Sequence, residues 1–307
     1  MGAKPATMPG MPNEDQNGAV AGEWHLKLFR KSLLKQAKLR RIVGLLGATR
    51  GEDCLDVGGD NGVVSYHLRA LGGTWTSVDM SEKAVESIRK LVGENVKLIQ
   101  PPALPFPDET FDVLVIIDLL EHVEDDAAFI AECHRVLKPT GRLIVNVPHI
   151  KRFAFLPPIR NMLGLTDDIH GHVRPGYTQS QLFDLLKDGF NVEEVQTYSR
   201  FFVEALDTGI RFLADRFGGG AGDPKGTMID EENFGRMDKL FRVYSILYPF
   251  FWLASKLDYL LFWTRGYCLI ARAKCRQWRP RRAPVLRDGR SIAEAALGGK
   301  IGSAAPF

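Results

Sequence analysis

A glycine-rich turn between an apolar segment and a helical one constrains this chain most. In Cys54-Leu55-Asp56-Val57-Gly58-Gly59-Asp60-Asn61-Gly62, an apolar strand runs into the pattern Asp-x-Gly-x-x-x-Gly. A second apolar strand ends at Asp79, about 20 residues further on, as in nucleoside-binding βαβ units. Small residues let the backbone approach a ligand closely, and the second acid can accept hydrogen bonds from a ribose diol. The pattern predicts a nucleoside site on an α/β sheet.

The charges in this turn distinguish between nucleoside cofactors. A dinucleotide places its pyrophosphate on a bare helix N-terminus, and the carboxylates of Asp56 and Asp60 would repel it. S-adenosylmethionine (AdoMet) has an ammonium, a sulfonium and a ribose but no phosphate. We therefore expect AdoMet, while a dinucleotide or a turn without any ligand remain the alternatives.

The downstream motifs support AdoMet. An apolar strand follows Leu104-Pro105-Phe106-Pro107-Asp108-Glu109-Thr110-Phe111-Asp112 and leads into Asp118-Leu119-Leu120-Glu121-His122-Val123. With these motifs, residues 51–148 resemble the class I AdoMet-dependent methyltransferases, in particular the ubiquinone/menaquinone-biosynthesis branch, and residues 177–195 do so more loosely. The resemblance implies an α/β fold: a Rossmann-like, doubly wound sheet of seven mostly parallel strands with an antiparallel last strand. It also implies an enzyme that transfers a methyl group.

The resemblance also implies a set of cofactor-binding residues. The methionine part would lie against the turn residues Asp56, Gly58, Gly59, Asp60 and Gly62, and the ribose against Asp79. The adenine would lie against Met80, Gln100, Ala103 and Leu104, and the reacting methyl against Asp118. Two positions depart from the family. Gln100 replaces an Asp that faces the adenine amine, and its carbonyl can still accept from that amine. Asp60 replaces a glycine, and would either reach the ammonium or cap the next helix.

Hydrophobic periodicity divides the chain into three parts. Residues 1–22 are expected to be disordered, 23–275 to form the methyltransferase domain, and 276–307 to form a basic flexible tail. Within the domain we expect strands at 53–57, 75–79, 96–100, 111–117, 142–147, 191–198 and 266–273. The expected helices are 23–46, 61–71, 81–91 with Ser81 as N-cap, 127–137 and 179–187.

A helical insertion separates the last two strands, which a short hairpin loop would otherwise join. It covers residues 202–265, with helical spacing over 204–217 and a strongly apolar and aromatic stretch over 240–263. Pro249, Lys256 and Asp258 interrupt that stretch, which argues against a transmembrane span. Three interpretations stay open: a cap that forms an acceptor pocket, a segment in a membrane interface, and a homodimer contact.

The composition limits partners and location. The net charge is +3, which gives no nucleic-acid signature, and four scattered cysteines favour reduced thiols in the cytoplasm. The basic face of the expected first helix, Lys27, Lys31, Lys35 and Lys38, would either sit on an anionic membrane or remain solvated while the helix packs over the cofactor site. We expect a cytoplasmic protein, peripheral at the inner face of the cytoplasmic membrane.

Methyl transfer from a sulfonium needs alignment and, for a hydroxyl acceptor, a general base. The acceptor side follows strands four and five, so His149 and His172 are the candidate catalytic residues, while His122 is expected to be structural. We expect no metal ion, although Asp167, Asp168, His170 and His172 could imitate a metal site. The expected function is methylation of a hydrophobic or membrane-associated acceptor, on oxygen rather than carbon. A methyltransferase for a soluble metabolite and a non-catalytic AdoMet-binding protein are the alternatives.

Overall fold

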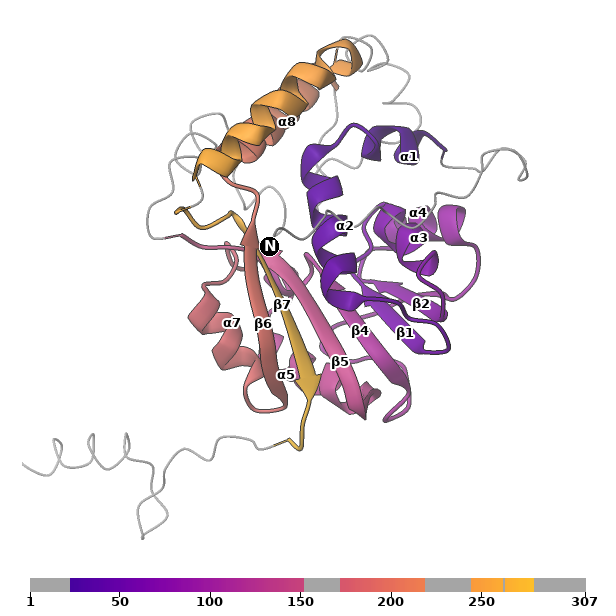
Figure 1. Cartoon of the computed structure of the whole chain (residues 1–307). Helices are drawn as coiled ribbons and strands as arrows, with labels where there is room; N and C mark the ends of the chain where they lie inside the picture. Colours follow the sequence, from indigo (N-terminus) through magenta and orange to yellow (C-terminus); the bar gives the residue numbers. More distant parts are fainter. Residues whose placement is uncertain (1–22, 152–171, 219–243, 262, 279–307) are drawn as a thin grey trace, which may run out of the picture.

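One seven-stranded sheet organises the chain, in the order β3-β2-β1-β4-β5-β7-β6 (Figure 1). The computed structural model describes residues 23–151, 172–218, 244–261 and 263–278. Strands β1 to β5 run parallel, and β7 is antiparallel to both β5 and β6, as predicted. The strands are β1 (Asp53–Val57), β2 (Thr74–Asp79), β3 (Val96–Leu98), β4 (Phe111–Ile117), β5 (Leu137–Pro148), β6 (Phe190–Tyr198) and β7 (Cys268–Cys275).

Helices cover both faces of this sheet, which explains the continuous apolar run of β4. Val113, Val115 and Ile117 belong to a buried cluster with α2 (Leu33–Leu46) and α3 (Val63–Arg69). The alternate residues Leu114 and Ile116 belong to a second cluster with α5 (Asp126–Val136) and α7 (Gln179–Leu186). A strand buried on both faces needs apolar side chains at every position, and β4 has them except at Asp112.

Several elements differ in their bounds from the sequence prediction. The expected helix at 23–46 is two helices, α1 (Glu23–Phe29) and α2, because Ser32 is extended and its hydroxyl caps α2 by accepting from the Lys35 N–H at 3.3 Å. β5 begins before the expected strand, at Leu137, and β7 ends two residues later than expected, at Cys275. The helix α4 (Glu82–Val92) has the expected cap, since Ser81 accepts from the Ala84 N–H.

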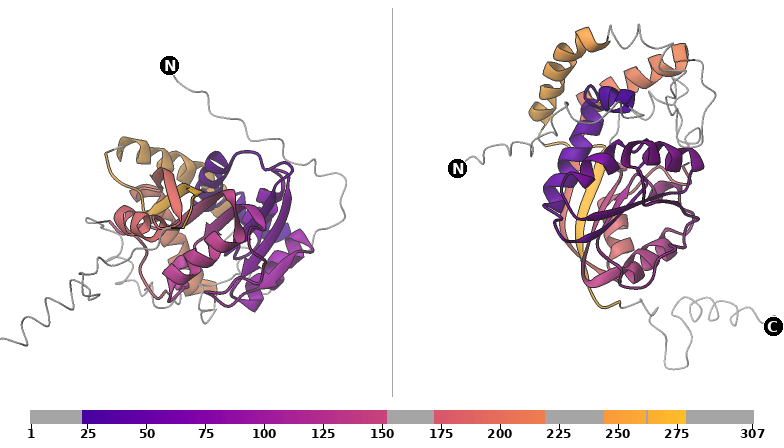
Figure 2. Two further views of the ribbon diagram at one scale, coloured as in Figure 1. Left: turned by 90° about the horizontal axis from the view of Figure 1, so that it is seen from below. Right: turned by 90° about the vertical axis from the view of Figure 1, so that its right-hand side faces the viewer.

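The insertion forms helices above the edge where β1, β2, β4 and β5 end (Figures 1 and 2). It contains α8 (Phe201–Gly218), a helix over residues 244–255 and the 3-10 helix η3 (Lys256–Leu261), so the helical spacing predicted at 204–217 is confirmed. Asp258 in η3 is buried and accepts the backbone N–H groups of Arg200 and Phe202 at 2.9 and 2.8 Å. These bonds fasten the end of the insertion to the beginning of α8. In the described ranges, no helix is both long and apolar enough to cross a bilayer.

Candidate functional site

The candidate site lies at the carboxyl-terminal edge of the sheet. Strand order reverses between β1 and β4, because the chain proceeds from β1 to β2 on one side and from β4 to β5 on the other. Open α/β sheets bind ligands at this switch point, outside the carboxyl ends of the strands. Asp56 in β1, Asp79 at the end of β2 and Asp118 directly after β4 all lie along this edge.

Asp56 shapes the turn from inside the fold. It is fully buried, and its oxygens accept the hydroxyls of Ser65 and Ser77, both at 2.7 Å. Burial raises the pKa of Asp56, while the guanidinium of Arg69 at 3.6 Å and the two hydroxyls oppose that shift. Neighbouring groups therefore compensate the charge of Asp56, which does not face a ligand. Of the two carboxylates in the turn, Asp60 is the one that could repel a pyrophosphate.

The turn glycines allow close backbone contacts. A Cβ on Gly58, which has φ of +87°, would lie 2.3 Å from the Ile117 carbonyl oxygen at the end of β4. A Cβ on Gly62 would lie 2.7 Å from the Cα of Ile88 in α4, and one on Gly59 would lie 2.5 Å from the Ser65 hydroxyl oxygen. The glycines thus bring the turn against the neighbouring strand end and helix. Their predicted contact with the methionine part of AdoMet stays a prediction.

Asp60 does not cap the helix that follows it. The N-cap of α3 is Gly62, without a side-chain cap hydrogen bond, so the capping alternative is wrong. Asp60 instead has a left-handed backbone with φ of 51°, and its carboxylate lies 3.7 Å from the ammonium of Lys35 in α2. A carboxylate already facing an alkylammonium suits the ammonium of AdoMet, which remains the predicted ligand of Asp60.

Asp79 ends β2 beside the same turn. Its oxygens accept the backbone N–H groups of Ser81 at 3.0 Å and Asp60 at 3.4 Å, and the residue is fully buried. A carboxylate has lone pairs for further donors. Because Asp79 is fully buried, a ribose can reach these lone pairs only when neighbouring residues move. The predicted ribose contact therefore includes a local opening.

The residues predicted to surround adenine follow β2 and β3. Met80 is half-buried against the core, and Gln100 and Ala103 are exposed and form an isolated bridge with each other. Leu104 is buried, and its N–H donates to Glu132 at 3.2 Å. The structure thus leaves Gln100 and Ala103 accessible to a base and makes Leu104 part of the core. Their roles toward adenine stay predictions.

Asp118 belongs to a polar network that the sequence analysis missed. Its carboxylate accepts from the Asn146 amide at 2.7 Å and pairs with Lys38 of α2, and Asn146 in turn accepts from the Tyr198 hydroxyl at 2.6 Å. Burial alone would lower the pKa of Lys38, but the adjacent Asp118 carboxylate raises it above the ordinary value. A signal was present in the sequence, since Asn146 interrupts the apolar run of β5.

The same contacts show which residues the lysines of α2 face. Lys35 and Lys38 face Asp60 and Asp118 across the site. The Lys31 ammonium lies over the Tyr248 ring, 4.7 Å from its centroid. The contacts of Lys35 and Lys38 agree with the alternative in which this helical region packs over the expected cofactor site.

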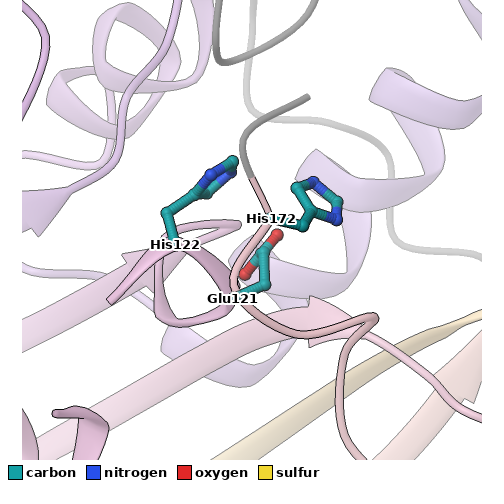
Figure 3. A group of neighbouring side chains, drawn as sticks. All are labelled: Glu121, His122 and His172. Carbon is teal, nitrogen blue, oxygen red and sulfur yellow. The ribbon is translucent and has the colours of Figure 1, made fainter. Parts of the chain in front are cut away.

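The candidate histidines occupy different surroundings. His149 is buried, its Nδ1 lies 2.7 Å from the Gly266 carbonyl oxygen, and burial lowers its pKa. It ties the end of β5 to the chain before β7. His172 lies beside His122, with ring centroids 4.7 Å apart, and next to Glu121 in the 3-10 helix η1 (Leu120–His122) (Figure 3). Asp167, Asp168 and His170 lie outside the described residues, and the catalytic roles of His149 and His172 stay predictions.

Residues 55–145 match a family model described as a methyltransferase domain. The demethylmenaquinone methyltransferase of Tropheryma whipplei (strain Twist) is 34% identical over 128 residues, which are 40% of this chain and 54% of that protein. The ubiquinone biosynthesis O-methyltransferase of Thiobacillus denitrificans is 35% identical over 98 residues, 30% of this chain and 42% of that protein. The chain thus spans about half the length of the curated relatives it matches.

A solved structure agrees at the level of the fold. The cyclopropane synthase MmaA2 from Mycobacterium tuberculosis has a TM-score of 0.51 and 19% identity, over 78% of this chain and 83% of that one. The chain therefore contains a class I AdoMet-dependent methyltransferase domain, whose cofactor is AdoMet. Within this class, it resembles the methyltransferases of ubiquinone and menaquinone biosynthesis.

Proposed function

We propose that this protein transfers the methyl group of AdoMet to a hydrophobic or membrane-associated acceptor, on oxygen rather than carbon. The acceptor classes are a quinone-like ring, a lipid head group and a lipid-linked sugar. The proposed location is the cytoplasm, peripheral at the inner face of the cytoplasmic membrane. The proposal rests mainly on one observation, the exposed apolar surface of the insertion.

This apolar surface consists of large side chains that point into solvent: Ile246, Phe250, Leu253, Tyr259, Leu260 and Trp263. Phe250 and Trp263 are each 68% exposed, and Leu260 is 64% exposed. Monomeric proteins rarely leave such a patch uncovered, and a large patch marks a site of interaction with a protein or a membrane. The ammonium of Lys256 lies over the Trp252 ring at 4.3 Å, a combination of cation and aromatic ring suited to a membrane interface.

Direct contacts connect the apolar surface to the cofactor edge. The Tyr244 hydroxyl donates to the Lys31 carbonyl at 2.5 Å, and the Gln36 amide donates to the Tyr248 hydroxyl at 3.3 Å. Both contacts join the helix at 244–255 to the α1–α2 region, whose residues Lys35 and Lys38 face the site acids. An acceptor delivered at the apolar surface would therefore arrive beside the edge where we expect the cofactor to bind.

The names of the relatives favour an acceptor of this kind. One is named for demethylmenaquinone and another for O-methylation in ubiquinone biosynthesis. O-methylation is also favoured by the predicted roles of His149 and His172, because a histidine can serve as base for a hydroxyl. A second copy of the chain could cover the same apolar surface, and vesicle co-sedimentation together with the oligomeric state distinguishes that alternative from membrane binding.

The test uses methyl-labelled AdoMet, the purified full-length protein and a total extract of its host, partitioned between organic and aqueous phases. We expect label in the organic phase that depends on the protein and disappears with an Asp79→Ala variant. Label found only in the aqueous phase would replace the hydrophobic acceptor by a soluble one. AdoMet binding without any labelled product would favour the non-catalytic alternative.

A further inference from the structure

We propose that the ammonium of Lys38 binds the methyl acceptor as an oxyanion and holds the attacking oxygen beside the methyl group of AdoMet. Lys38 is then a catalytic residue that α2 contributes to the edge of the sheet. The inference rests on the proposed function for the methyl transfer itself, whereas oxyanion binding can be measured without turnover.

Lys38 brings a buried positive charge to the edge where β4 ends. α2 packs against the sheet through Ile42 and Leu45, and its amino-terminal half reaches this edge (Figure 1). The Lys38 side chain is 15% exposed and pairs with the carboxylate of Asp118, the first residue after β4. Burial alone would lower the pKa of Lys38, but nearby carboxylates, that of Asp118 above all, raise it above the ordinary value. Lys38 therefore remains a cation at neutral pH and does not act as a base.

The Lys38 ammonium can donate to more than one acceptor. An ammonium has three N–H donors, and among the residues that the structure describes, Asp118 is the only hydrogen-bond acceptor of Lys38. A buried ammonium gains from further acceptors, because it has lost water. Hydrogen bonds between two charged groups are about twice as strong as those between neutral groups. An oxyanion therefore suits Lys38 better than a neutral hydroxyl does.

A hydrogen-bond network fixes the carboxylate that positions Lys38. The Asp118 backbone N–H donates to the Asn146 carbonyl at 2.9 Å, and the Asn146 side-chain amide donates to the Asp118 carboxylate at 2.7 Å. The Tyr198 hydroxyl donates to the Asn146 amide oxygen at 2.6 Å. Asn146 and Tyr198 are both buried, and side chains in a close-packed interior have little freedom to move. Asp118 and Asn146 are thus positioning residues, and Lys38 is the member of the network that contacts the acceptor.

The charges at this edge favour an anionic acceptor. The sulfonium of AdoMet is predicted to lie near Asp118, so two cations, the sulfonium and Lys38, flank one carboxylate. The next carboxylate along the edge, that of Asp60, lies 3.7 Å from the ammonium of Lys35. An oxyanion balances the remaining positive charge at the point where the methyl group is transferred.

The transfer begins when the acceptor hydroxyl gives its proton to a base, for which His149 and His172 are the predicted candidates. The oxyanion accepts a hydrogen bond from Lys38, which increases the ionised fraction of the acceptor and holds its oxygen for attack. The oxygen forms a bond to the methyl carbon, while the carbon–sulfur bond breaks and its electron pair stays on sulfur. The products are the methyl ether and S-adenosylhomocysteine. An acidic hydroxyl such as that of a phenol suits this step better than the hydroxyl of a sugar.

The test compares two probes that differ in the oxyanion: 4-nitro-1-naphthol, which is ionised at pH 8, and 1-nitronaphthalene, which lacks the hydroxyl. Their affinities for the full-length protein are measured by equilibrium dialysis in the presence of S-adenosylhomocysteine, whose sulfur is uncharged. We expect the parent to prefer the naphtholate. In Lys38→Met this preference should fall about 10-fold to 150-fold, the range of a hydrogen bond to a charged group. Lys38→Arg should retain most of it, because it keeps the positive charge.

Lys90→Met is the matched control, because Lys90 is an exposed lysine on α4. AdoMet affinity and far-ultraviolet circular dichroism on the same samples show whether the variants fold. A parent that does not prefer the naphtholate would overturn the inference without any variant. An unchanged preference in Lys38→Met, or an equal fall in Lys90→Met, would also overturn it.

Methyl transfer distinguishes this inference from the proposed function. Label that Lys38→Met transfers into the organic phase as fast as the parent would remove the role of Lys38 and leave the proposed function standing. A parent that prefers the naphtholate through Lys38 but labels no acceptor would support the oxyanion site and remove the proposed function.

Discussion

Replacing the exposed side chains of the apolar surface should abolish vesicle binding while the fold stays intact. Phe250, Leu253 and Trp263 are 68%, 63% and 68% exposed. Fully burying a side chain of this size gains about 1.5–3 kcal/mol, so about two-thirds of that, roughly 1–2 kcal/mol, is available from each on entering a membrane. A Phe250→Ser, Leu253→Ser, Trp263→Ser variant therefore loses about 3–6 kcal/mol, which is roughly 100-fold to 10⁴-fold in partitioning.

The assay is co-sedimentation of the full-length protein with sucrose-loaded vesicles of phosphatidylcholine and phosphatidylglycerol. The matched control is Phe183→Ser, compared with Phe250→Ser alone, because Phe183 is a 51% exposed phenylalanine on α7, away from the insertion. We expect the control to bind like the parent and all these variants to unfold at similar urea concentrations, since exposed substitutions usually change stability by less than about 0.5 kcal/mol. Undiminished vesicle binding by the triple variant would refute the reasoning. A parent dimer that the triple variant converts to monomer, with no vesicle binding by either, would assign the surface to a second copy of the chain.

Three further substitutions test contacts inside the fold. Asp258→Ala removes two bonds from backbone N–H groups to a buried carboxylate and should lower the free energy of unfolding by about 1.5–3 kcal/mol; an unchanged urea midpoint would contradict this fastening role. Tyr198→Phe deprives the buried Asn146 amide oxygen of its donor and should cost about 1–3 kcal/mol by the same measurement. For His149, burial lowers the folded-state pKa below the ordinary value of 6.5, so the unfolded chain binds the proton more readily and the free energy of unfolding falls as the pH drops below about 6.5. His149→Asn, which preserves a donor toward the Gly266 carbonyl, should flatten this pH dependence between pH 7 and 5, and an identical slope would assign it to other groups.

The sheet was predictable where local signals agree. β1 and β4 occupy the predicted residues 53–57 and 111–117, because each is a buried run with clear boundaries. The N-cap at Ser81 was also recognisable from its neighbours. The break between α1 and α2 was not, since Ser32 is followed by the same helix-favouring, basic pattern that precedes it. Its cause is a single side-chain cap, which periodicity does not record.

The candidate site was predictable in its acids but not in their partners. The strand ends placed Asp56, Asp79 and Asp118 along one edge, because parallel strands meet there. Lys38, however, lies 80 residues before Asp118 and was assigned by helical spacing to an outer basic face. His172 came to lie beside Glu121 and His122 only through tertiary contacts. Such pairings depend on the packing of distant segments, which local sequence patterns do not specify.

The affinity for AdoMet, measured by isothermal titration calorimetry on the parent and on Asp79→Ala, tests whether the edge of β1, β2 and β4 is the cofactor site. Glu94→Ala, at an exposed acid beyond α4, is the control. The account predicts one AdoMet per chain, competed by S-adenosylhomocysteine, and a loss of about 1.5–3 kcal/mol in Asp79→Ala, roughly 10-fold to 150-fold in Kd. Equal affinities in the parent and Asp79→Ala would show that the cofactor lies elsewhere, and a parent that binds no AdoMet would contradict the account.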